Sequence, residues 1–79
     1  MNEINLRSVD LNLLTIFQAI YIDGQIVKAA VTLGLTQPAV SHALTRLRAM
    51  FNDPLFIRSR TGMEPTPRAH EISDQVNKP

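Results

Sequence analysis

The sequence predicts a mostly α-helical domain that carries one short β-hairpin, and three observations predict this fold class. Apolar residues recur at helical spacing over residues 11–22, 26–33 and 37–51. Short turns containing glycine separate these three ranges. After Asn52-Asp53-Pro54 the helical period stops, and two short strand-like runs precede one more helical run. Three helices, a two-stranded hairpin and the start of a further helix make up a winged helix-turn-helix.

Length and composition limit what the chain can be. Its 79 residues suffice for one domain, which we expect over residues 1–66, followed by a truncated linker helix over residues 67–79. The sequence contains no cysteine, which excludes disulfides, a thiolate nucleophile and cysteine-ligated zinc. It has no apolar run near the roughly 20 residues of a membrane span, no signal peptide and no catalytic constellation. We therefore expect a cytoplasmic protein that is not an enzyme, uses no cofactor or metal and binds no membrane.

The first helix is expected over residues 11–22. Asp10 is a good N-cap, and Asp23-Gly24 marks the end of the helix. The apolar residues of this helix fall on one face, which we expect to form the floor of the core: Leu13, Leu14, Phe17, Ile20 and Tyr21.

The next two helices have the residue types of a helix-turn-helix. Ala30 is small enough to let a second helix approach closely, and Gly34 can adopt the left-handed conformation that ends the first helix of the pair. Val40 then fills the angle between the two helices. The expected inner residues are Ile26, Ala29, Ala30 and Leu33 in the first helix and Val40, Leu44, Leu47 and Phe51 in the second.

The helix over residues 37–51 is the predicted recognition helix. Thr36 is its expected N-cap, and Pro38 falls in its first turn, where a missing backbone N–H costs least. Its remaining faces are polar and basic, with nothing obvious inside the protein to bind, so we expect their partner to lie outside. These residues are Gln37, Ser41, His42, Thr45, Arg46 and Arg48.

Positive charge is concentrated on the same part of the chain. Residues 28–60 carry five basic side chains against Asp53 alone, a net charge of +4, whereas the whole chain has a net charge of +1. A cationic segment is what binding to phosphates requires. The alternative is that each of these side chains is an ordinary solvated group. Their clustering favours binding to nucleic acid.

The hairpin and the last helix complete the predicted fold. Residues 55–58 and 63–66 are expected to form strands joined across residues 59–62, and Pro65 is tolerable on an edge. Thr66 can cap a helix that starts at Pro67. This helix is only about three turns long and cannot bury its apolar stripe alone. The stripe consists of Ala69, Ile72 and Val76.

The chain resembles the amino-terminal DNA-binding domain of the LysR-type bacterial transcriptional regulators, over about residues 9–76. The most specific part is the run Gln37-Pro38-Ala39-Val40-Ser41. The family usually opens its second helix with hydroxyl residues, where this chain has Gln25-Ile26-Val27, and Lys28 can compensate. The other matching residues are Asp10-Leu11-Asn12-Leu13-Leu14, Phe17, Ala29-Ala30, Leu33, Thr36, Leu44, Leu47, Leu55-Phe56, Arg58 and Thr66.

The resemblance implies a function and partners. It implies sequence-specific binding of double-stranded DNA, with the recognition helix in the major groove and the hairpin on the backbone. It also implies a homodimer on an interrupted inverted repeat, paired through the linker helix by Ala69, Ile72 and Val76. The small-molecule effector domain of the family is absent from this sequence, so no small-molecule response is expected. The expected DNA-binding residues are Lys28, Thr36, Gln37, Pro38, Ser41, His42, Thr45, Arg46, Arg58 and Arg60.

A different class of function shares the same predicted fold. The domain could be a protein-interaction module that pairs with a full-length regulator through the linker helix. A module of that kind has no reason to keep the basic segment between Lys28 and Arg60, so DNA binding is favoured. His42 and His70 are interpreted as ordinary side chains, because a set of metal ligands is lacking. Met50 and Met63 are interpreted as core filler.

Overall fold

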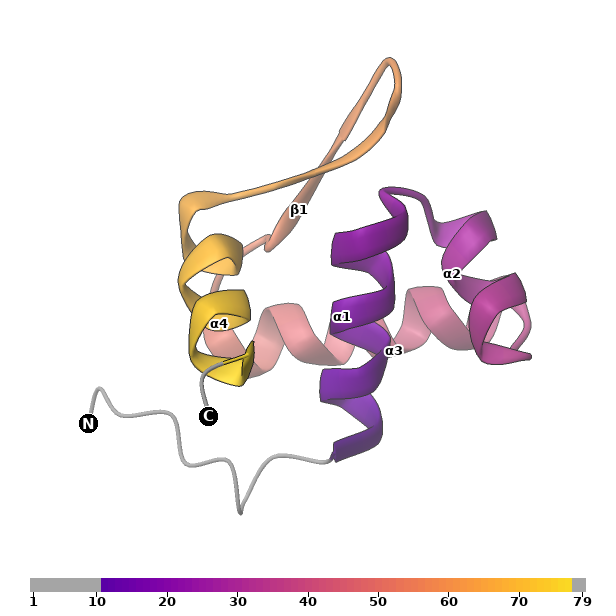
Figure 1. The fold of residues 1–79 in the computed structure, drawn as a ribbon, viewed down its shortest axis with the longest axis horizontal. Coiled ribbons are helices and arrows are strands. Elements are labelled where there is room, and N and C mark those ends of the chain that lie inside the picture. The colour runs from indigo at the N-terminus through magenta and orange to yellow at the C-terminus, as the bar shows by residue number, and fades with distance from the viewer. Residues whose placement is uncertain (1–10, 78–79) are drawn as a thin grey trace.

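A computed structural model describes residues 11–77 of the chain (Figure 1). The expected cap Asp10 and the residues Lys78 and Pro79 lie outside the described part. Four helices and one antiparallel hairpin follow each other in the predicted order. Their bounds are α1 Leu11–Asp23, α2 Ile26–Leu33, α3 Gln37–Phe51, β1 Phe56–Ser59, β2 Gly62–Pro65 and α4 Pro67–Asn77.

Helix α1 is the centre of the packing. It crosses α3, with α2 on one side and α4 on the other (Figure 1). The predicted floor residues Leu13, Leu14, Phe17 and Ile20 are buried, and Tyr21 is half-buried. Further side chains of α1 are also buried because neighbours surround most of the helix. Predicted core filler Met63 is half-buried, but Met50 is 44% exposed, so that prediction was wrong for Met50.

The helix-turn-helix forms as predicted, and its two helix ends are locally determined. Gly34 has φ 69°, and the N–H of Leu35 donates to the Ala30 carbonyl at 2.9 Å, which closes the end of α2. Thr36 Oγ1 accepts the N–H of Ala39 at 3.2 Å, which caps the start of α3. Val40 is fully buried in the angle between the helices.

The hairpin runs one residue later on its first strand and one residue earlier on its second strand than predicted. Its register pairs Phe56 with Pro65 and Ser59 with Gly62. Leu55 is excluded from β1 because its φ of 63° is left-handed, although its side chain is fully buried. The Asp53 carboxylate accepts the Leu55 N–H at 2.8 Å and so stabilises this bend. The connection between α3 and β1 is therefore a tight turn that directs the Leu55 side chain into the core.

Helix α4 is covered by its own chain, which corrects one prediction. Ala69 and Ile72 are both 0% exposed, and Val76 is half-buried against the same core. The prediction that Ala69 and Ile72 pair with a second copy was wrong for these two side chains, because the domain's own core covers them. Periodicity revealed the apolar face but could not show that α1 packs against it. The Tyr21 hydroxyl, hydrogen-bonded to His70 Nδ1 at 2.7 Å, ties the same two helices together.

We predict that Ile72→Ala destabilises the isolated chain. Removing a fully buried isoleucine side chain leaves a cavity, so the free energy of unfolding should fall by about 2–5 kcal/mol. Urea unfolding followed by circular dichroism measures the change, with the exposed Gln75→Ala as the matched control, expected within about 0.5 kcal/mol of wild type. A wild-type stability for Ile72→Ala would mean that Ile72 is not a core residue.

Candidate nucleic-acid interface

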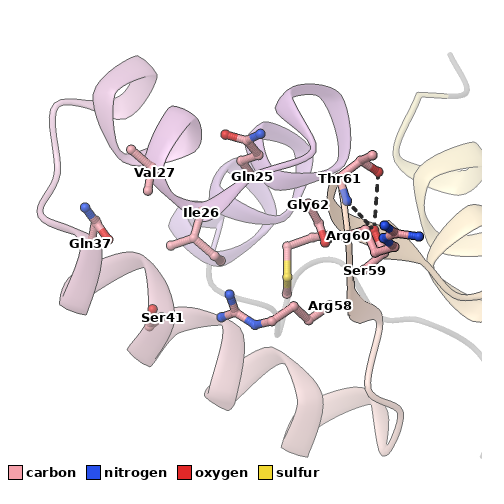
Figure 2. Close-up of a pocket in the computed structure, with 11 residues that line it drawn as sticks. Gln25, Ile26, Val27, Gln37, Ser41, Arg58, Ser59, Arg60, Thr61 and Gly62 are labelled. Carbon is pink, nitrogen blue, oxygen red and sulfur yellow. Dashed lines mark hydrogen bonds between the residues drawn. The ribbon is translucent and has the colours of Figure 1, made fainter.

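A groove of about 420 Å³ lies between α3, the start of α2 and the wing formed by β1 and β2 (Figure 2). It brings together four of the residues predicted to contact DNA, from two distant parts of the chain: Gln37, Ser41, Arg58 and Arg60. The groove also exposes backbone and side chains that the sequence interpretation did not include. Its other lining residues are Gln25, Ile26, Val27, Ser59, Thr61, Gly62 and Met63.

Helix α3 supplies one wall of the groove. Gln37 and Ser41 are four residues apart, about one turn, and line the groove together. Thr45 follows one turn later, with its hydroxyl donating to the Ser41 carbonyl at 3.1 Å. His42 and Arg46 are exposed on the outer side of the helix. Helix α3 therefore leaves polar side chains open in the groove and basic side chains exposed on its outer side.

The start of α2 supplies a second wall. Gln25 occupies the N-cap position without a side-chain cap hydrogen bond. The first N–H groups of a helix lack intrahelical acceptors and carry partial positive charge, so this helix end favours an anion. Sequence reasoning named Lys28 but missed Gln25, Ile26 and Val27 as groove residues. The signal that could have revealed them is a helix start without Ser, Thr, Asp or Asn as its cap.

The wing supplies the basic side chains that line the groove. Arg58 lies on β1 and extends into the groove below α2, whereas Arg60 lies at the hairpin tip (Figure 2). Ser59 organises this tip, because its hydroxyl donates to the Gly62 carbonyl at 3.2 Å and accepts the Thr61 N–H at 3.3 Å. Both arginines are exposed.

Several predicted contact residues lie outside the groove. Thr36 and Pro38 are exposed at the start of α3, and the Thr36 hydroxyl is engaged in the helix cap. Lys28 is exposed on α2. Their positions are compatible with contacts to a partner larger than the groove, but they do not line it.

Arg48 does not belong to the outward basic face, which corrects the prediction for this residue. It is half-buried, and its Nε donates to the Pro54 carbonyl at 2.7 Å while Nη2 donates to the Phe56 carbonyl at 2.8 Å. The only acidic residue between positions 28 and 60, Asp53, also turns inward, accepting hydrogen bonds from Leu55 and Thr66. The remaining basic side chains of this segment are exposed: Lys28, Arg46, Arg58 and Arg60.

Other kinds of site have little support in the described residues. Over residues 11–77, no cluster of three or more His, Cys, Asp or Glu side chains could hold a metal ion. In the same part of the chain, no helix has the length and apolar character needed to cross a membrane. His70 and Asp74 lie one turn apart on α4, and His70 Nδ1 is hydrogen-bonded to the Tyr21 hydroxyl.

The fold and the groove define a winged helix-turn-helix with an open, cationic face. Residues 11–70 match the bacterial regulatory helix-turn-helix proteins of the lysR family. The chain belongs to this family. The transcriptional activator NahR of Pseudomonas putida is 52% identical over 71 residues, which are 90% of this chain and 24% of NahR. The regulator LeuO of Escherichia coli K12 is 51% identical over 73 residues, which are 92% of this chain and 23% of LeuO.

Solved structures agree with the sequence relatives. The probable transcriptional regulator PA0477 from Pseudomonas aeruginosa has a TM-score of 0.84 and 44% identity over 90% of this chain and 24% of that one. The DNA-binding domain of CbnR, solved in complex with DNA, has a TM-score of 0.80 and 26% identity over 86% of this chain and 78% of that one. The chain spans about a quarter of the length of NahR and LeuO.

Proposed function

We propose that this LysR-family domain binds double-stranded DNA sequence-specifically, with α3 in the major groove and the wing on the sugar-phosphate backbone. The observation that carries the proposal is the groove lined by Gln37 and Ser41 of α3 and by Arg58 and Arg60 of the wing, with Arg58 extending toward α3. Likeness to the CbnR domain, solved with DNA, supports the same assignment. In a bacterial cell such a domain would regulate transcription in the cytoplasm.

The chemistry of the two walls suggests a division of labour. Gln37 carries an amide that can pair with the two hydrogen-bonding groups on the major-groove edge of adenine, and Ser41 and His42 can reach neighbouring groups. Arg58, Arg60 and the start of α2 offer positive charge without base preference. We therefore assign base reading to α3 and phosphate binding to the wing and α2.

Selection of random duplexes by the purified chain, followed by sequencing, tests the proposed function directly. Enrichment of one recurrent motif is expected. Retention of all sequences equally would contradict sequence-specific reading, and failure to retain any duplex would contradict DNA binding altogether.

Gln37→Ala should weaken binding mainly to the selected sequence. Loss of a two-bond contact to a base costs about 1–3 kcal/mol, whereas binding to random duplex should change much less. Fluorescence anisotropy with both duplexes measures the difference. Ile22→Ala on α1, an exposed position outside both the groove and α4, is the control and should bind both duplexes as the wild type does. Equal losses on both duplexes for Gln37→Ala would make Gln37 a positioning residue.

Arg58→Ala should weaken binding to all duplexes to a similar degree. Because one phosphate contact is lost, the slope of log K against log salt concentration should decrease in magnitude by about 1. Titrations at several salt concentrations give this slope. Arg68→Ala on α4, where Arg68 pairs with Glu71 at 3.2 Å, removes the same charge away from the groove and should leave the slope unchanged. A lost preference at one base position with an unchanged slope would contradict the assignment.

We also infer that two domains occupy the two halves of an interrupted inverted repeat, as the family membership suggests. Because Ala69 and Ile72 face the domain's own core, any pairing through α4 has to use its outer residues. Those outer residues are polar, so pairing in solution is expected to be weak, and DNA would bring the two domains together. The exposed residues of this face are His70, Glu71, Asp74 and Gln75.

Binding stoichiometry tests this arrangement. Sedimentation of the chain with a duplex carrying two half-sites, about 34 Å or a multiple apart, should show two chains per duplex. A duplex with one half-site should carry one chain, and the chain alone should sediment as a monomer. A single chain on the full repeat at saturation would show that the inverted-repeat assignment is wrong.

A further inference from the structure

Arg48 connects the recognition helix to the base of the wing. It lies eleven residues after Gln37, about three helical turns, and therefore on the same side of α3 as the residues that line the groove. Its guanidinium donates to two backbone carbonyls, Pro54 at 2.7 Å and Phe56 at 2.8 Å. Pro54 precedes the wing and Phe56 begins β1, so both acceptors belong to the wing's base.

The hairpin register explains why the Phe56 carbonyl is available. The Thr66 N–H donates to the Leu55 carbonyl at 2.9 Å. The inter-strand hydrogen bonds therefore extend one residue pair beyond the pair Phe56 and Pro65. Because hydrogen-bonded and non-hydrogen-bonded pairs alternate in an antiparallel ladder, Phe56 occupies a non-hydrogen-bonded pair. Its carbonyl points away from β2, along the outer edge of the hairpin. The Arg48 guanidinium thus donates to the outward-pointing carbonyl of Phe56 at this edge.

The opposite edge of the hairpin is held by the turn between α1 and α2. Met63 occupies the next non-hydrogen-bonded pair, opposite Arg58, and its N–H donates to the Gly24 carbonyl at 2.7 Å. Gly62 lies so close to the same carbonyl that an added Cβ would overlap it. An isolated two-stranded hairpin is marginally stable in water, so these outer contacts fix the wing against the helices. Arg58 lies two residues after Phe56 on β1 and directly opposite Met63, so both contacts act close to it.

We propose that Arg48 is a positioning residue for DNA recognition, one that sets the wing relative to α3 and acts through Arg58. The proposal rests on the proposed DNA binding. A planar guanidinium can donate to two carbonyls at once, whereas the ammonium of lysine is a single point charge on a flexible stem. The geometry therefore requires arginine at this position, and a positive charge alone does not suffice.

Coupling between Arg48 and Arg58 tests the proposal. Arg48→Gln and Arg48→Lys should each weaken binding to the selected duplex by about tenfold, because the wing no longer holds Arg58 in place. Adding Arg58→Ala to either variant should cause little further loss, since the contact is already lost. Arg46→Gln is the matched control on the outer face of α3, and its effect should multiply with that of Arg58→Ala.

Amide hydrogen exchange of the free protein provides a readout without DNA. Exchange in β1 and β2 should accelerate in Arg48→Lys and remain as in the wild type in Arg46→Gln. Thermal unfolding identifies the temperature range in which every variant is folded, and all binding is measured there. If Arg48→Gln is unfolded throughout, the binding and hydrogen exchange of Arg48→Lys decide whether the proposal holds.

Three results would overturn the positioning role of Arg48 while leaving DNA binding intact. The first is that the losses of affinity caused by the Arg48 and Arg58 substitutions multiply in the double variant. The second is that Arg48→Lys binds the selected duplex as tightly as the wild type. The third is that amide hydrogen exchange in β1 and β2 is unchanged in Arg48→Lys. Wild-type affinity in Arg48→Lys would instead indicate direct contact of a cation with phosphate. Failure of the wild-type chain to bind any duplex would overturn the proposed function together with this proposal.

Discussion

Phe17 and Phe56 pack with their ring centroids 5.4 Å apart, and neither side chain is exposed by more than 1%. Phe17 lies in the middle of α1, and Phe56 begins the wing. This aromatic contact joins the helical core to the first residue of the hairpin, and the contacts that Arg48 and Gly24 make with the wing act on that support. Helices α2, α3 and α4 all pack on the same central helix, so the walls of the groove share one support.

Local signals account for most of what the sequence could predict. The end of α2 follows from Gly34, and the starts of α3 and α4 follow from Thr36 and Thr66, because caps act within a few residues. Strand β1 starts one residue later than predicted because Leu55 adopts a left-handed conformation, and the Asp53 carboxylate that accepts the Leu55 N–H is held in turn by Thr66, thirteen residues further along the chain. Long-range packing could not be predicted in the same way. An apolar stripe on α4 is visible in the sequence, but the surface that covers it is not.

The residues of the candidate site also differ in whether the sequence alone could predict their positions. Gln37 and Ser41 were predictable because helical spacing puts them on one face, and Arg58 because it lies on a predicted strand of the wing. Arg48 has the same residue type as the outward arginines, and only its tertiary contacts with Pro54 and Phe56 separate it from them. Asp53 is likewise drawn inward by Leu55 and Thr66. The fold thus turns some charged side chains inward and leaves others exposed, a difference that composition cannot show. The exposed charges of residues 28–60 are therefore all positive.

A wing fixed at both edges has a consequence for affinity. Ordering a mobile hairpin on DNA would cost conformational entropy at the moment of binding, and that cost would reduce the contribution of each arginine. Here the hairpin edges are already paired, through Arg48 on one side and through Gly24 and Met63 on the other. The distance between α3 and the wing is therefore set before DNA arrives. Specificity then depends on whether a duplex presents its base edges and phosphates at that fixed spacing, which makes the shape of the DNA part of what the domain reads.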